Sequence, residues 1–175
     1  MPGAIDLVIV VDAETILASY TSPSFDPDAP TVLAEDDCYL IAPPTNTEQG
    51  QATAYVRLDA QGSRFLDWRS LTLSGNADSS AVIYRLGEVS RFLPMGPSTA
   101  HEREQWAPVP ILVNGENLDP PDFGATQLTS YFLRTLAGGP GKNTFEACFY
   151  ITVPDDNGEP VVAGYFQWSA ALTLG

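Results

Sequence analysis

Apolar and polar residues alternate one by one along several parts of the chain, which is the pattern of β-strands with one buried face. In the clearest example, residues 144–153, every second residue from Phe145 to Val153 is apolar. Four segments share this pattern: 52–59, 81–86, 144–153 and 162–174. We therefore predict a strand at each of them.

Five further segments are rich in branched and aromatic residues and are bounded by turn-forming residues, as strands commonly are. They are 4–11, 37–42, 64–73, 106–113 and 127–136. The longest irregular stretch, residues 90–104, is expected to be an exposed loop. The whole pattern predicts an all-β fold with one domain over residues 1–175. Its architecture is expected to be an antiparallel β-sandwich, jelly-roll or Greek-key-like, of about eight or nine strands.

Two segments carry more specific local signals. The run Asp-Asp-Asn-Gly at 155–158 lies between two alternating segments and predicts a hairpin with a type I′ turn, because Asn and Gly accept a positive φ. Residues 5–11 are apolar enough for a central parallel strand, and Asp12 is placed to cap a helix over 14–20. An α/β opening is the minor alternative, although a short helical turn also fits inside a β fold.

The chain is strongly acidic, with 22 Asp and Glu against 8 Lys and Arg and a net charge of −14. No Lys or Arg occurs before Arg57. Such a surface repels phosphate backbones and anionic lipids, so we expect neither a nucleic-acid nor a membrane partner. The charge suits high solubility, or attraction of cations or of a basic partner.

The start of the chain lacks the basic and apolar regions of a secretory signal, so we expect a cytoplasmic protein. Cys38 and Cys148 do not form a CxxC spacing and are expected to be free thiols. His101, the one histidine, lies in a polar stretch and is expected at the surface. These residues provide no evident nucleophile and base, so we expect no enzymatic activity, cofactor or metal.

Polar and aromatic residues in two places are candidates for ligand binding. Asn76 and Asp78, in the segment SGNADSS, can either hydrogen-bond a ligand's hydroxyl groups or fix their own turn, which is the commoner use. Trp106 is predicted to be the most exposed of the three tryptophans and can stack on a sugar ring, whereas Trp168 is predicted to lie in the core. The acidic run 155–159 does not fit a calcium loop and is explained by the hairpin.

Several stretches, in order along the chain, resemble the AidA/PixA inclusion-body family of bacterial proteins. They are IDLVIVVDAETI (5–16), CYLIAP (38–43), GQATAYVRL (50–58), WRSLTLSGNADSSAVIY (68–84) and GYFQWSAALTL (164–174). The resemblance implies a single β-sandwich domain made in the bacterial cytoplasm, under quorum-sensing or phase-variation control in some relatives and accumulating as inclusions in others. It carries over the motif residues Asp12, Asn76, Ala77 and Asp78, but no catalytic role. Since this chain has only two methionines, the sulfur storage suggested by a methionine-rich relative is not expected.

Three functional hypotheses follow. The leading one is a non-enzymatic protein that assembles with copies of itself into a homo-oligomer. The alternative is a lectin-like β-sandwich that binds carbohydrate, with calcium assistance as one variant, through Asp12, Asn76, Asp78 and Trp106. The third is a hydrolase, which requires two carboxylates about 5–10 Å apart in one cleft.

Overall fold

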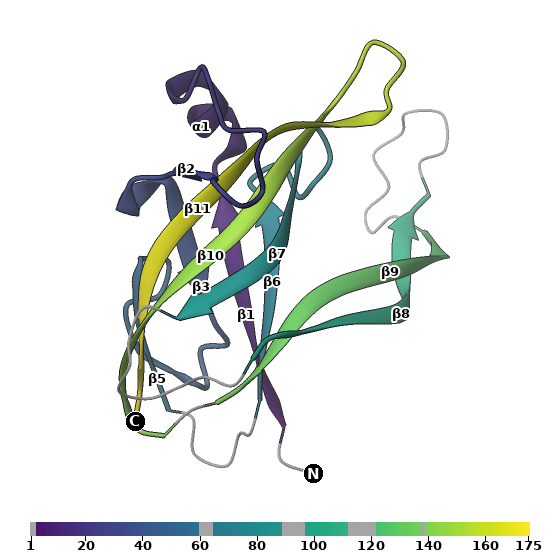
Figure 1. Ribbon diagram of the computed structural model, residues 1–175. Coiled ribbons are helices and arrows are strands. Elements are labelled where there is room, and N and C mark those ends of the chain that lie inside the picture. Colours follow the sequence, from purple (N-terminus) through teal and green to yellow (C-terminus); the bar gives the residue numbers. More distant parts are fainter. Residues whose placement is uncertain (1–2, 60–64, 89–96, 112–121, 138) are drawn as a thin grey trace.

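The computed structural model describes residues 3–59, 65–88, 97–111, 122–137 and 139–175, which form two stacked β-sheets (Figure 1). The first sheet contains, in spatial order, β3 (Cys38–Ile41), β1 (Ala4–Val11), β6 (Phe65–Thr72), β9 (Phe123–Leu136) and β8 (Thr99–Pro110). The second contains β4 (Thr47–Gln49), β5 (Tyr55–Leu58), β11 (Pro160–Leu174), β10 (Gly141–Pro154) and β7 (Ser80–Glu88), with the short β2 (Thr31–Val32) also paired to β11. The all-β sandwich prediction is confirmed.

All nine predicted strand segments are present, and β2 and β4 are additional short strands. The largest error in strand bounds concerns the expected loop at 90–104. Residues 89–96 lie outside the described residues, but β8 begins at Thr99, so the loop prediction is wrong for residues 99–104.

Both sheets are mixed, which the antiparallel prediction did not include. β1 pairs in parallel with β6, and β11 pairs in parallel with β5 and β2. Alternation specifies which side chains of a strand are buried, but it does not specify the direction of the neighbouring strand. The parallel pairs form because the chain crosses to the other sheet and back between their two strands.

Large aromatic side chains fill the space between the sheets. Trp68, Phe145, Phe149, Phe166 and Trp168 are fully buried. The ring centroids of Trp68 and Phe145 lie 4.7 Å apart in an edge-to-face arrangement, which is favourable for aromatic pairs. The prediction that Trp168 belongs to the core is confirmed.

A short helix, α1 (Ala13–Ser19), follows β1 and is the α-helix of the described residues. The Asp12 carboxylate accepts a hydrogen bond from the Thr15 backbone N–H at 3.1 Å, so Asp12 caps the helix as predicted. The apolar run of β1 is explained by its central place between β3 and β6, not by an α/β fold. No helix in the described ranges is long and apolar enough to cross a membrane.

The turn between β10 and β11 differs from the predicted type I′ turn. Gly158 has a φ of +83°, whereas Asn157 is not among the described residues with positive φ. The Gly158 N–H donates to the Asp155 carbonyl at 2.9 Å, and the Asp155 carboxylate accepts from the backbone N–H groups of Asn157 and Glu159. These backbone donors lower the pKa of Asp155 and stabilise its carboxylate in the turn.

The two cysteines are free and buried, Cys38 in β3 of the first sheet and Cys148 in β10 of the second. Burial raises the pKa of the Cys38 thiol, and the neighbouring Asp37 and Asp12 raise it further. A thiol held in its neutral form is a poor nucleophile.

Candidate functional site

The SGNADSS segment forms the tight turn between β6 and β7. Asn76 has a φ of +62°, and its side-chain oxygen accepts hydrogen bonds from the backbone N–H groups of Thr72 at 2.9 Å and Ala81 at 3.3 Å. The Thr72 hydroxyl donates to the Ser79 carbonyl at 2.8 Å in the same turn. The amide oxygen of Asn76 therefore fixes its own turn, the commoner of its two predicted uses.

Asp12 and Asp78 are brought together at one small cleft. Both line a hollow of about 150 Å³ beside Thr72 and Ser74, between the start of α1 and the β6–β7 turn. Asp12 also caps the helix. Among the described residues, no three His, Cys, Asp or Glu side chains lie close enough together to hold a metal ion.

Trp106 does not line this cleft, because it lies on β8. Its side chain is 71% exposed, whereas Trp68 and Trp168 are fully buried. The prediction that Trp106 is the most exposed tryptophan is confirmed. The four candidate ligand residues therefore occupy two separate places: the cleft and turn hold three, and the surface of β8 holds the fourth.

The surroundings of Trp106 form an extension that sequence analysis missed. Within the described residues, β9 pairs with β6 from Leu133 to Leu136. The pairing of β9 with β8 is much longer: it runs from the Thr99–Arg134 pair to the Pro110–Phe123 pair. We call residues 101–111 and 122–132 the β8–β9 arm. Figure 1 shows this two-stranded ribbon leaving the stacked sheets.

One side of the arm continues the core-facing side of the first sheet. Leu133 belongs to the core, so the alternating residues before it on β9, including Tyr131 and Phe123, point to the same side. On β8 this side carries Trp106, which pairs with Gln127. Trp106 and Phe123 are 71% and 72% exposed, so large apolar side chains lie there uncovered. We call this side the inner face of the arm.

The opposite side of the arm is also apolar near the end of the ribbon. Val109, Ile111 and Leu128 are about half exposed there. Residues 105–111 and 123–133 contain no charged side chain, although the chain as a whole carries −14. The outer part of the arm is therefore apolar and, apart from Asp122 at its end, uncharged, whereas the part next to the sandwich carries Glu102, Arg103 and Glu104.

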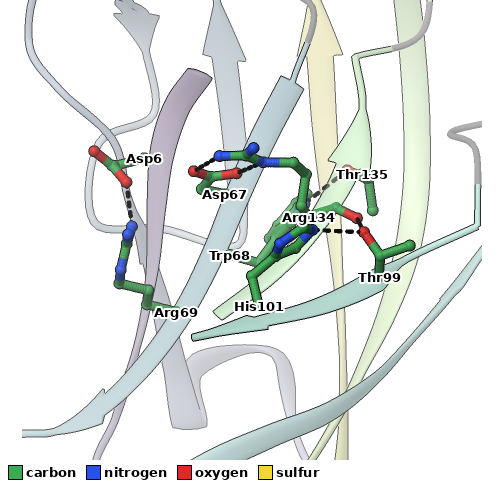
Figure 2. Close-up of polar contacts among 8 residues, drawn as sticks. All are labelled: Asp6, Asp67, Trp68, Arg69, Thr99, His101, Arg134 and Thr135. Carbon is green, nitrogen blue, oxygen red and sulfur yellow. Dashed lines mark hydrogen bonds and ion pairs between the residues drawn. The ribbon is translucent and has the colours of Figure 1, made fainter. Parts of the chain in front are cut away.

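A cluster of charged and aromatic side chains fastens the arm to β6 (Figure 2). Arg134 donates to both carboxylate oxygens of Asp67, from Nε at 2.6 Å and from Nη2 at 2.7 Å. The guanidinium of Arg69, which is paired with Asp6, lies 4.7 Å from the centre of the Phe132 ring. These contacts fix the end of the arm that adjoins the sandwich, which we call the root of the arm.

His101 lies in this same root. Its ring stacks on Phe132 with centroids 5.3 Å apart, and its Nε2 forms a 2.9 Å hydrogen bond with the Thr99 hydroxyl. The side chain is partly buried, so the surface position expected from the sequence is only partly correct. The observed contacts give His101 a packing role.

The free edge of β8 is interrupted by prolines. The Ile111 N–H donates to the Asp122 carbonyl at 2.8 Å, so the odd-numbered residues of β8 direct their backbone groups towards β9. The even-numbered residues direct theirs to the open edge. Pro108 and Pro110 lie at even positions and lack an N–H, so the outer half of this edge cannot complete a ladder with another strand.

The comparisons with known proteins agree on one family. A model of the PixA family, described as "Inclusion body protein", matches residues 3–174. The fold is similar to the crystal structure of a PixA inclusion body protein from Burkholderia cenocepacia J2315, with a TM-score of 0.77 and 19% sequence identity over 98% of this chain and 95% of that chain. No curated protein matches the sequence.

Proposed function

Because this chain belongs to the PixA inclusion body protein family, we propose that it is a non-enzymatic protein that associates with copies of itself through the β8–β9 arm. The observation that carries the proposal is the exposure of Trp106 and Phe123 on the inner face of a ribbon that leaves the sandwich. An isolated two-stranded ribbon is only marginally stable in water, and it becomes stable when its apolar face is covered.

The size of the exposed surface supports a specific contact. Trp106 and Phe123 alone expose roughly 300 Å² of side chain, since a large aromatic residue buries 150–250 Å² when covered. Tyr131 adds to this surface on the inner face, and Val109 and Leu128 are exposed on the opposite side of the arm. A stable dimer buries about 800 Å² on each partner, so the arm supplies a large part of what is needed.

The charge of the molecule favours a second copy as the occupant. Two chains of net charge −14 repel each other over most of their surfaces, and residues 105–111 and 123–132 of the arm, which contain no carboxylate, are a place where they can approach with less repulsion. A basic partner would be attracted to the acidic surfaces instead. The prolines at the edge of β8 favour contact through the faces of the arm over strand addition.

The proposal includes the bacterial cytoplasm as the compartment. Cys38 and Cys148 are unpaired, and free thiols are usual in a reducing compartment. The non-enzymatic part of the proposal is supported by the packing role of His101 and by the burial of both thiols.

Light scattering coupled to size-exclusion chromatography tests the association. We expect wild-type protein to form a dimer or a larger closed oligomer at high concentration, and Trp106→Glu to weaken association by at least about tenfold, as for a central aromatic contact. Phe25→Glu is the matched control, because Phe25 is 68% exposed but lies outside the arm. A wild-type monomer at high concentration, or equal weakening by both variants, would overturn the proposal.

Tryptophan fluorescence gives an independent reading without substitution. Trp68 and Trp168 are buried, so quenching by acrylamide reports mainly on Trp106. We expect the accessible fraction to fall as protein concentration rises, because association covers Trp106. Quenching that does not depend on concentration would contradict a contact at the inner face.

A further inference from the structure

A groove crosses the outer face of the second sheet, where β5, β11 and β10 lie side by side. Two hollows of about 500 and 370 Å³ share Tyr55, Lys142 and Ala171 and so form one continuous depression. Thr144 and Thr173 are among its lining residues. The depression is within the size range of small-molecule sites, which is about 300–1,000 Å³.

Lys142 supplies the groove with a positive charge that forms no ion pair with a described carboxylate. It is the single lysine of the chain. Among the described arginines, those that contact a carboxylate are Arg57, Arg69, Arg85 and Arg134. Lys142 has no such contact within the described residues, and its ammonium lies 5.7 Å from the centre of the Tyr55 ring. In a chain of charge −14, an unpaired cation in a groove is available to an anionic ligand group.

Tyr55 gives the groove an aromatic wall. Its side chain is about half exposed, and its hydroxyl donates a 2.6 Å hydrogen bond to the Glu35 carboxylate, which fixes the ring. This bond raises the pKa of the Tyr55 hydroxyl. A fixed and exposed ring of this kind offers an apolar face against which the C–H groups of a sugar can pack.

The loop before Tyr55 holds the wall in a defined conformation. Gly50 has a φ of +80°, and a Cβ at this position would lie 1.7 Å from the Tyr55 carbonyl oxygen, so only glycine fits. Ala52 has a φ of +58°, which is unusual for a residue with a side chain. The Gln51 side-chain amide forms two hydrogen bonds with the backbone of Ala42. Its oxygen accepts from the Ala42 N–H, and its nitrogen donates to the Ala42 carbonyl. The wall is therefore preorganised, and strained backbone of this kind is often found at binding sites.

From these observations we propose that the Tyr55–Lys142 groove binds a sugar that carries one carboxylate, that is, a hexuronic acid. Lys142 pairs with the carboxylate, the Tyr55 ring packs against the sugar's C–H face, and Thr144, Ser169 and Thr173 hydrogen-bond its hydroxyl groups. Glu35, which lines one of the two hollows, disfavours a doubly charged phosphate. The site lies on β5, β10 and β11 and does not depend on the arm.

Isothermal titration calorimetry with D-glucuronic and D-galacturonic acid tests this proposal on the wild-type protein, with D-glucose and D-galactose at the same concentrations for comparison. We expect binding of the acidic sugars in the millimolar range and at least tenfold weaker binding of the neutral ones. Lys142→Gln is expected to remove this preference, and Tyr55→Ala to abolish binding. Arg103→Gln, a cation on the arm, is the matched control and is expected to bind as the wild type does.

Two results would overturn the proposal. One is the absence of binding for all four sugars, and the other is equal binding of acidic and neutral sugars that Lys142→Gln leaves unchanged. Repeating the titration with Trp106→Glu keeps the two proposals apart. Binding that persists when association is lost supports an independent site, whereas binding that requires association contradicts it.

Discussion

Arg134 donates two hydrogen bonds to the carboxylate of Asp67 across the junction between β9 and β6. The side chain of Asp67 is only 7% exposed, whereas that of Arg134 is 32% exposed. The guanidinium also lies over the rings of Phe65 and Phe132. One arginine therefore connects the last residues that β9 shares with the sandwich to the first residues of the β8–β9 arm.

Replacing Asp67 should test how strongly this pair stabilises the fold. We expect Asp67→Asn to lower the free energy of unfolding by about 3 kcal/mol, because it removes one partner of a largely buried ion pair. Urea denaturation measures the change. Asp6→Asn is the matched control, since the Asp6 side chain is 59% exposed in its pair with Arg69, and its cost should stay below about 1 kcal/mol. Equal effects of the two variants would contradict a special role for Asp67.

The turn role of Asn76 gives a second prediction. Asn76→Ala removes hydrogen bonds to the Thr72 and Ala81 backbone and places a less tolerant residue at positive φ, so we expect a loss of about 2 kcal/mol. Asn76→Gly keeps the backbone conformation and should lose less. Asp78→Ala, in the same turn, should change stability by less than about 0.5 kcal/mol. Thermal unfolding distinguishes the three variants, and a neutral Asn76→Ala would argue against the turn role.

A buried amide provides a third prediction. Asn143 is fully buried, and neither its side-chain oxygen nor its nitrogen has a hydrogen-bond partner in the described structure. Asn143→Leu replaces both polar atoms with methyl groups on a side chain of the same branching, so we expect the free energy of unfolding to rise by about 1 kcal/mol. Asn143→Asp should lower it. Chemical denaturation measures both changes, and a destabilised leucine variant would show that the amide is satisfied in solution.

The alkaline stability of the protein should depend on Cys38. Its thiol pKa is raised above the ordinary value of 9.0, chiefly by burial, so the folded state retains a proton that the unfolded state releases. This stabilisation is complete below pH 9 and is lost as the pH rises above it, by up to about 1.4 kcal/mol per pH unit. Urea denaturation between pH 8 and pH 10 should show a smaller decline in Cys38→Ala than in the wild type. Parallel declines would contradict the assignment.

The alternation of apolar and polar residues predicted the sandwich well where one side of a strand is buried and the other is exposed to solvent. β10 and β11 show this, because Phe145, Phe149 and Phe166 alternate with more exposed residues. The arm could not be predicted in this way. Residues 101–105 are polar on both sides, because both sides of the ribbon are exposed, and such a stretch looks like a loop in the sequence.

The sequence pattern also could not predict which strands pair with each other, or which distant residues come together to form a groove. The parallel pairing of β1 with β6 depends on contacts between residues about sixty positions apart, such as Leu7 and Trp68, which local pattern does not encode. The Tyr55–Lys142 groove was missed for the same reason, since it joins β5 to β10 across β11. Its one local signal was that Lys142 is the single lysine of the chain.

The position of β11 bears on how the protein folds while it is being synthesised. β11 is central in its sheet and pairs with β10, β5 and β2, yet it follows all of them in the chain. As the ribosome releases the chain, β2 gains its neighbouring strand and β5 gains its second neighbour, beside β4, when residues 160–174 emerge, and Phe145 and Phe149 wait for Trp168 and Phe166. Nascent chains should therefore expose aromatic surface until β11 has emerged from the ribosome, which makes them clients for chaperones that shield it.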